Sequence, residues 1–207
     1  MEVILLGFIW YQIIAIFGIS IGMHRYYSHN MDFKIPKLYE ILILFMVTIA
    51  GARSVIGWCA AHRIHHQFAD TEFDPHSPDR KGFWKVFLNL WTIPKIERKL
   101  VKDLLKNKLV VLQHKYWYET LIITSIISVL IGIKFFIGFI IIPLILSYIG
   151  YGLFNALGHK DFKPVTNMFI NILSAGEAYH DIHHNNVGKI RYGKWDISGF
   201  IIEKVFK

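Results

Sequence analysis

The feature that most constrains the fold is a run of twenty uncharged residues, Val3 to Gly22, close to the start of the chain. At about 1.5 Å of rise per residue, a helix of this length crosses the hydrocarbon core of a bilayer. A cleaved signal peptide is not expected. The run follows Met1-Glu2 with no basic segment and continues directly into Met23-His24-Arg25 without a small-residue cleavage motif. The run therefore predicts a membrane-spanning helix.

Two more apolar segments extend this prediction. Leu38–Trp58 is broken near its end by Gly51–Ser54, and Thr120–Leu157 is broken only by Gly132–Lys134, which indicates two short spans joined by a tight turn. Hydrophobic residues make up 54% of the chain and charged residues only 18%, against about 25% in an ordinary soluble domain. This composition excludes a disordered chain and a disulfide scaffold, and it favours an integral membrane protein.

The remaining segments are polar. Residues 62–118 are basic and contain two amphipathic pieces, Phe83–Trp91 and Ile96–Leu112, that indicate surface or interfacial helices. Residues 159–207 form a polar tail, and strand signals are weak throughout. We therefore predict one all-α domain over residues 1–207, in which a membrane helical bundle carries a cytoplasmic cap.

The placement of positive charge predicts the orientation. The chain has 23 Lys and Arg against 15 Asp and Glu, a formal net charge of +8. If residues 3–22 span once and 120–157 form a hairpin, only Lys134 among these cations lies on the side of the N-terminus. The positive-inside rule makes the other face cytoplasmic, which explains the basic excess without nucleic acid. The single cysteine, Cys59, cannot form an intramolecular disulfide, so no oxidising compartment is implied.

Nine of the eleven histidines fall in four clusters, each at the polar end of an apolar segment. One HxxxxH, one HxxHH, one single histidine and a second HxxHH follow in chain order: His24 and His29; His62, His65 and His66; His159; His180, His183 and His184. Positions i, i+3 and i+4 share one face of a helix, so each HxxHH presents three imidazoles to one side. Positions i and i+5 lie about 140° apart, so His24 and His29 need a bent helix end or serve two different metals.

Neutral imidazole is the commonest metal ligand in proteins. Nine imidazoles exceed what one ion takes and suit two ions, while the ligand type leaves Zn, Cu, Fe and Ni open. All four clusters must meet at one face of the membrane if the nine histidines are to bind two ions in one site. Residues 38–58 therefore cannot cross the membrane once, and we predict that this segment is re-entrant or interfacial, bent at Gly51–Ser54 and buried in protein where it is not helical.

These residues resemble the integral-membrane fatty acid desaturases of the stearoyl-CoA desaturase-like family, from about Gly18 to the C-terminus. Beyond the histidines, the resemblance rests on Trp58–His66, Asp74-Pro75-His76-Ser77-Pro78, Asp103-Leu-Leu with Gln113-His114, Asn155 to His159, Gly176-Glu177, and Gly188–Asp196. The Asp-Pro-His-Ser-Pro motif and the tail are more similar to the bacterial branch than to the animal one.

The resemblance implies an oxidoreductase that uses O₂ and two iron ions (Fe²⁺) to place a cis double bond, at Δ9, in a saturated acyl chain during lipid biosynthesis. By the family pattern the nine clustered histidines are iron ligands. Asn155 would hold a water on one iron, and Glu177 would orient an imidazole. The protein itself would supply a dry apolar channel that positions one C–C bond.

The chain departs from the family in two ways. The family usually has two spans before the first histidine motif, and here there is room for one, so a reduced enzyme or a chain incomplete at its N-terminus is expected. The animal acyl-CoA enzymes carry Arg-Asp where this chain has Ala60-Ala61, which leaves acyl-lipid or acyl-carrier substrates open beside acyl-CoA. Nothing follows Lys207, so we expect a separate electron donor, a ferredoxin or a cytochrome b5-like protein.

Residues outside the clusters have alternative roles. His76 and His114 are expected to be structural or close to substrate, and Cys59 a small buried filler. Aromatic side chains either line an acyl channel or anchor at headgroup depth: Trp58, Phe83, Trp84 and Trp91. Three cations contact a substrate headgroup or an acidic electron donor, or are attracted to anionic lipid: Lys189, Arg191 and Lys194.

Two other function classes stay open at this point. One is a hydroxylase or related oxygenase on the same histidine scaffold, and the other is a non-enzymatic haem or metal-binding membrane protein. The Asn155 to His159 motif together with Asp74-Pro75-His76 favours the desaturase over the hydroxylase. A haem needs only one or two axial histidines, so nine clustered histidines argue against the haem protein.

Overall fold

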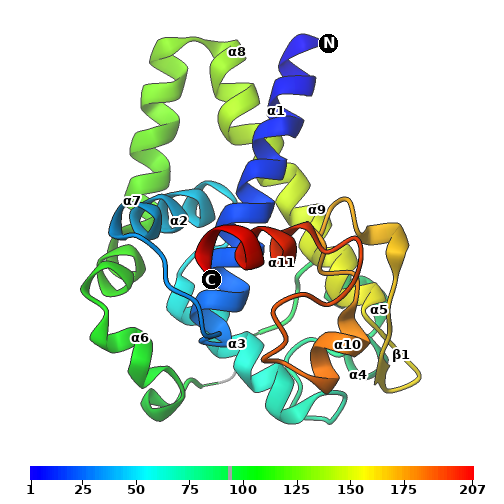
Figure 1. Cartoon of the computed structure of the whole chain (residues 1–207). Coiled ribbons are helices and arrows are strands. Elements are labelled where there is room, and N and C mark those ends of the chain that lie inside the picture. Colours follow the sequence, from blue (N-terminus) through cyan, green and yellow to red (C-terminus); the bar gives the residue numbers. More distant parts are fainter. Residues whose placement is uncertain (93–94) are drawn as a thin grey trace.

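A computed structural model describes residues 1–92 and 95–207, and the predicted region 62–118 therefore contains two residues outside the described part of the chain. Most regular structure is helical (Figure 1). Two strands, β1 (His159–Lys160) and β2 (Lys163–Pro164), have two residues each and pair antiparallel. The prediction of an all-α helical bundle is confirmed.

Three long helical rods form the upper part of the molecule (Figure 1). The first is α1 (Glu2–Ile13), which continues without a break into η1 (Ile14–Ser28). The second is α7 (Lys108–Ile131), and the third runs through α8 (Ile133–Phe136), η3 (Ile137–Ile141) and α9 (Ile142–Leu157). Gly132 joins the second rod to the third with φ +155°, a value at the edge of the region that favours glycine. The N-terminus and this turn lie at the same end of the molecule.

Two of these rods, Glu2–Ser28 and Ile133–Leu157, are long and apolar enough to cross a membrane. Only 39% and 22% of their most apolar stretches are buried, whereas the core helix of a soluble protein is mostly buried. Their exposed side chains include Ile4, Leu5 and Ile145. A surface of this kind is stable only against other apolar material, so these rods indicate a membrane protein. That α7 also crosses the membrane stays a prediction.

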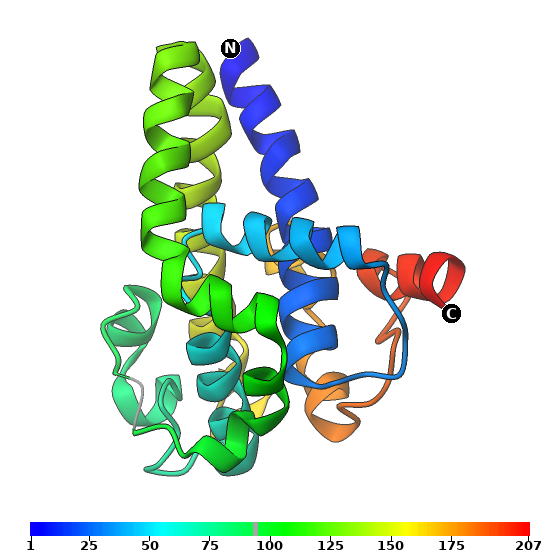
Figure 2. The ribbon, with the colours of Figure 1, turned by 90° about the vertical axis from the view of Figure 1, so that its left-hand side faces the viewer.

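The segment between the first and second histidine motifs bends sharply. Helix α2 (Lys37–Ile49) is followed by a turn in which Gly51 and Arg53 have φ of +71° and +59°, and then by α3 (Val55–Phe68). Ser54 begins α3 as an N-cap, since its hydroxyl accepts a hydrogen bond from the Gly57 amide. Helix α2 lies across the long rods rather than along them (Figure 2), which is the geometry that an interfacial segment requires.

Short helices surround the middle and the lower end of the bundle. They are α4 (Pro78–Lys81), α5 (Phe83–Phe87), η2 (Arg98–Val101), α6 (Lys102–Lys106), η4 (Met168–Ile170), α10 (His180–Asn185), α11 (Ile197–Ile201) and η5 (Ile202–Phe206). The largest buried apolar cluster lies between η1, α2 and α3 and includes Met23, Ile43, Val47 and Cys59. This packing holds η1 against α3 and so fixes the first two histidine motifs relative to each other.

Candidate metal centre

The structure brings all nine clustered histidines together at the lower end of the bundle. They form two groups, within each of which the nearest ring nitrogens all lie within 4.8 Å of one another. The first group has five members, His24, His29, His62, His66 and His183, and the second has four, His65, His159, His180 and His184. Each HxxHH motif divides its side chains between both groups, so α3 and α10 each serve two sites.

A local change in helix type brings the two histidines of the HxxxxH motif together. Residues Ile14–Ser28 form a π-helix, in which the amide of residue i+5 bonds to the carbonyl of residue i. The His29 amide accordingly donates to the His24 carbonyl at 3.1 Å. This winding turns positions i and i+5 toward the same side, and the two Nε2 atoms lie 3.2 Å apart. His24 and His29 therefore belong to one group rather than to two.

The spacing of the donor atoms suits metal ligation. In the first group the Nε2 atoms of His29 and His62 are 2.8 Å apart, and those of His66 and His183 are 2.9 Å apart. In the second group the Nε2 atoms of His159 and His180 are 3.0 Å apart. Two imidazole nitrogens that each bind the same ion at about 2.1 Å, with a right angle between the two bonds, would lie about 3 Å apart. An all-imidazole donor set fits Fe as well as Zn, Cu or Ni.

The protonation of these side chains also suits ligation. Burial, followed by repulsion from neighbouring imidazoles such as His24, lowers the pKa of His66 to about 3. Burial and the neighbouring imidazoles likewise lower the pKa of His184 to about 2 and hold that of His62 well below its usual value. The imidazoles of His62, His66 and His184 are therefore neutral near pH 7, and neutral imidazole is the form that binds a metal.

Carboxylates lie beside the outer nitrogens of three histidines. Glu177 lies 3.1 Å from Nδ1 of His24, and its role in orienting this imidazole stays a prediction. Asp74 accepts from Nδ1 of His65 at 2.8 Å, and Asp70 accepts from Nδ1 of His159 at 2.6 Å. A carboxylate in this position fixes the tautomer and directs Nε2 toward a metal.

The roles of Asp70 and Asp74 were missed in the sequence. The available signal was a pair of acidic residues four apart, directly after the first HxxHH. Their partners are on two different segments: His65 is nine residues before Asp74, and His159 is 89 residues after Asp70.

A buried arginine completes this layer. The side chain of Arg25 is fully buried and contacts Glu177, Ser20 and, at 2.9 Å, Asp196. Burial alone would raise the pKa of Glu177, but Arg25 and His24 hold it below its ordinary value. Burial raises the pKa of Asp196, although Arg25 opposes this. Arg25 thus connects the carboxylate behind His24 to the C-terminal segment.

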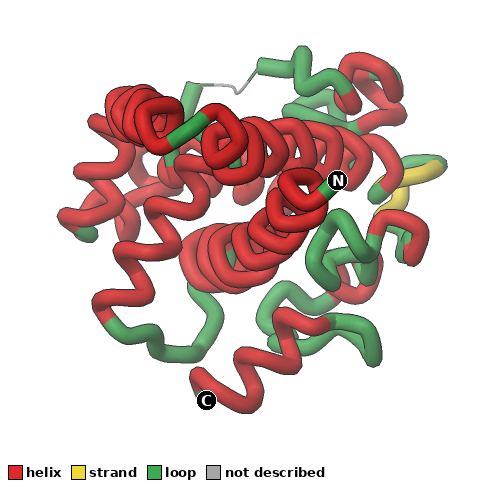
Figure 3. Tube along the Cα trace, turned by 90° about the horizontal axis from the view of Figure 1, so that it is seen from above, coloured by secondary structure: helices red, strands yellow, loops and turns green. Residues whose placement is uncertain are grey.

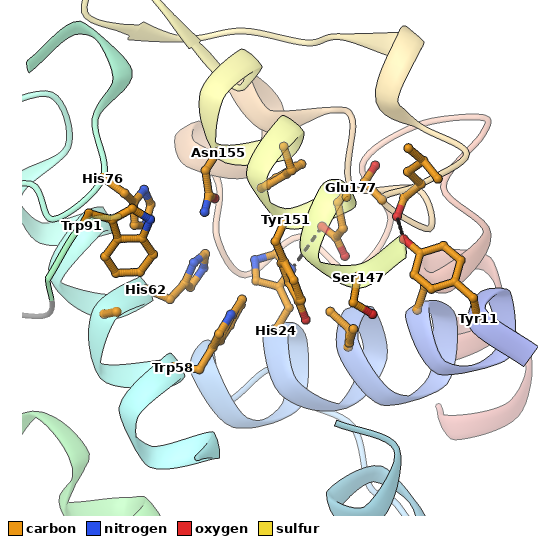
Figure 4. Close-up of a pocket in the computed structure, with 17 residues that line it drawn as sticks. Tyr11, His24, Trp58, His62, His76, Trp91, Ser147, Tyr151, Asn155 and Glu177 are labelled. Carbon is orange, nitrogen blue, oxygen red and sulfur yellow. Dashed lines mark hydrogen bonds and ion pairs between the residues drawn. The ribbon is translucent and has the colours of Figure 1, made fainter. Parts of the chain in front are cut away.

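An apolar cavity runs from the first histidine group to the side of η1 (Figure 4). His24, His62, His76 and Asn155 lie around one part of it, and Tyr11 donates a hydrogen bond to the Leu173 carbonyl at another. Trp58 and Trp91 line the cavity, which favours the first of their two alternative roles, the lining of a channel. Phe83 and Trp84 do not line it and are exposed on α5, so for them the alternative of anchoring is the better interpretation.

The other predicted residues lie outside the cavity. Nδ1 of His114 lies 2.6 Å from the Ser54 hydroxyl, a structural contact at the start of α3, and Cys59 is fully buried in the apolar core. Lys189 is exposed. Arg191 and Lys194 line a separate groove beside the C-terminal segment. The ligation of a metal-bound water by Asn155 stays a prediction.

These features together define a class, a helical membrane protein with two adjacent all-histidine clusters that could each hold a metal ion, beside an apolar cavity. Comparison with protein families gives the family itself. The fatty acid desaturase family matches residues 3–191, and the chain belongs to this family.

Curated relatives agree with this assignment. The chain is 30% identical over 220 residues to an icosanoyl-CoA 5-desaturase of Limnanthes douglasii, covering 96% of this chain and 60% of the relative. It is 28% identical to a Delta-9 acyl-lipid desaturase 2 of Arabidopsis thaliana, covering 94% and 69%. It is 29% identical to an sn-1 stearoyl-lipid 9-desaturase of Synechocystis, covering 93% and 64%. The chain thus spans between 60% and 69% of the length of these relatives.

Proposed function

We propose that this protein is an O₂-dependent fatty acyl desaturase whose nine clustered histidines bind two iron ions. The observation that carries the proposal is the direct contact between the first histidine group and the apolar cavity, because His24 and His62 are both ligand candidates and cavity walls. Bound there, a pair of irons would supply reductive activation of O₂ and hydrogen abstraction from an unactivated carbon.

The residues of the chain position the acyl substrate and the metal ligands. The cavity wall between the histidines and Tyr11 is formed by aromatic and aliphatic side chains, among them Trp58, Ile19 and Phe154, which exclude water and hold an extended acyl chain. Asp70 and Asp74 keep two imidazoles in one tautomer, and Glu177, 3.1 Å from Nδ1 of His24, would do the same for a third. Asn155 lies at the cavity beside His62 and His76 (Figure 4), which supports a role in holding a metal-bound water.

We propose further that the double bond is cis and lies at Δ9 of a chain of roughly 16–18 carbons, since a fixed cavity counts carbons from the acyl headgroup. The names of the relatives include both 5- and 9-desaturases and both acyl-CoA and acyl-lipid substrates. Ala61 lies in the cavity wall at the position where the animal enzymes carry a charged pair. We therefore favour an acyl-lipid substrate over free acyl-CoA, with electrons from a ferredoxin or cytochrome b5-like protein at the cytoplasmic face.

Expression in a host with a competent electron donor, followed by lipid analysis, tests the proposal. The expected product has one new cis double bond, and deuterium is lost from two adjacent carbons of a labelled chain. His62→Ala should abolish the product and lower bound iron in the purified protein, whereas His114→Ala should keep the iron. A hydroxylated chain with no new unsaturation would assign the protein to the hydroxylases instead, and product formation without bound iron would contradict the metal assignment.

A further inference from the structure

The C-terminal segment forms a second groove, away from the cavity. Helix α11 packs against η1 and lies across the long rods at about the height of α2 (Figures 1 and 2). Seen along the rods, the C-terminal helix is at the periphery of the bundle (Figure 3). The groove lies between Gln12 and Ile16 of the first rod, Ile172, and the strip from Arg191 to Phe200.

The rim of this groove is apolar and exposed. The side chains of Met168, Ile172 and Trp195, which line the groove, are 42%, 67% and 62% exposed, and exposure of large apolar groups to water is costly. The neighbouring turns of the first rod carry exposed Ile9 and Ile13, which belong to the predicted membrane-spanning surface. The groove is therefore continuous with the apolar surface of a membrane helix at the level where that helix enters the bundle.

The exposed charge in the groove is positive. The Lys194 ammonium lies 5.1 Å from the centre of the Trp195 ring, and the Arg191 guanidinium lies 5.4 Å from that of Phe200. Asp196, which also lines the groove, is fully buried and paired with Arg25. Glu203 lies 3.7 Å from Arg191. Lys194 forms no salt bridge with the described residues.

From this arrangement we propose that the groove binds the phosphate headgroup of an anionic membrane lipid, with Trp195 at headgroup depth. Lys and Arg beside Trp at the level of a membrane boundary is the pattern of an interfacial anchor, and such cations are attracted to anionic lipid. An acidic electron donor fits less well. It would pair with the cations but would leave the apolar side chains of the groove rim in contact with water. This lipid site does not depend on the proposed desaturase activity.

Depth-dependent quenching tests the position of the groove. In a Cys59→Ala background, Trp195→Cys is labelled with bimane and the protein is reconstituted in bilayers with lipids that carry a nitroxide near the headgroup or deep in the chain. The matched control is Phe73→Cys, a similarly exposed aromatic residue (64%) in the loop after α3. We expect strong quenching of residue 195 by the shallow nitroxide and little quenching at residue 73. Equal, weak quenching at both positions would overturn the proposal.

Lipid selectivity tests the chemistry of the groove. Native mass spectrometry of protein purified from phosphatidylglycerol and phosphatidylcholine mixtures should show retained phosphatidylglycerol. Two cations at about 1 kcal/mol each correspond to about 30-fold in affinity, so Arg191→Gln with Lys194→Gln should weaken retention by about that factor. Lys102→Gln with Lys106→Gln on α6 is the control pair. Unchanged lipid retention in the Arg191→Gln, Lys194→Gln variant would show that the groove is not a lipid site. The same conclusion would follow if this variant kept the lipid but could no longer be reduced by an acidic electron-donor protein.

Discussion

At the scale of single residues, the candidate metal centre includes carboxylates that lie behind its imidazoles. Asp70 and Asp74 each occupy the outer nitrogen of one imidazole in the second group. Replacing either carboxylate by Asn keeps the size of the side chain but allows the wrong tautomer, with a proton on Nε2. We expect Asp70→Asn and Asp74→Asn to weaken metal binding by about 10–100-fold, measured by titration of the metal-free protein with Fe²⁺ or Co²⁺.

The control for this experiment is Asp181→Asn, since Asp181 bonds to Thr166 at the surface and to no histidine ring in the described contacts. Its metal affinity should match that of the unmodified protein. Equal affinity in all three variants would show that the carboxylates do not orient the ligands.

Arg25 matters at the same scale for its charge, because it neutralises two buried carboxylates. Arg25→Gln would leave Glu177 and Asp196 buried without a counter-charge, which costs about 3–5 kcal/mol. We expect a correspondingly large loss of stability, measured by denaturant unfolding in detergent. Lys99→Gln removes an exposed ion pair with Glu97 and should leave stability unchanged.

A triple variant separates charge from metal orientation. Arg25→Met combined with Glu177→Gln and Asp196→Asn removes all three charges together and should recover most of the lost stability. It should not recover metal affinity, because the neutral amide introduced by Glu177→Gln cannot fix the tautomer of His24 as a carboxylate does. Recovery of neither property would show that the network acts through packing instead.

At the scale of elements, the contact between η1 and α2 sets the position of the first histidine motif. A Cβ added at Gly22 would overlap with Cγ2 of Ile43, which is fully buried. Gly22→Ala should therefore push the two helices apart and destabilise the protein by about 1–3 kcal/mol, with weaker metal binding because His24 is two residues away. Unfolding and metal titration measure the two effects.

A double-mutant cycle isolates this contact. Gly22→Ala in an Ile43→Ala background should cost much less than in the unmodified protein, with a coupling of about 0.5–3 kcal/mol. The control is Gly57→Ala, where the nearest atom to an added Cβ is Cβ of Ser54 at 4.0 Å. Additive effects of the first pair would mean that Gly22 is needed for another reason.

The same elements explain what could be predicted from the sequence. The break at Gly51–Ser54 and the turn at Gly132 follow from glycine in the chain, and the helical face of HxxHH follows from a period of about 3.6 residues. The joining of His24 to His29 does not follow, because a π-helix alters that period. Arg25 was missed because its partners lie 152 and 171 residues further along the chain, beyond any local pattern.

At the scale of the whole molecule, the charges and the two ends of the bundle predict one orientation. The N-terminus and the turn at Gly132 lie at the upper end, and both histidine groups lie at the lower end (Figure 1). Lys134 is exposed beside the upper turn, whereas Lys102 is exposed on α6 at the lower end. If the positive-inside rule holds, Lys134 lies outside the cytoplasm and Lys102 lies inside.

Single cysteines at these two lysines test the orientation. Lys134→Cys should react with a membrane-impermeant maleimide in intact cells, and Lys102→Cys should react only after the membrane is opened. The native Cys59 is fully buried and serves as an internal control that reacts only on unfolding. Labelling of both positions from the same side would disprove the hairpin, because a chain that crosses twice between 102 and 157 must place its turn opposite α6. Labelling of Lys102→Cys alone in intact cells would invert the orientation and move the histidine groups to the outer face.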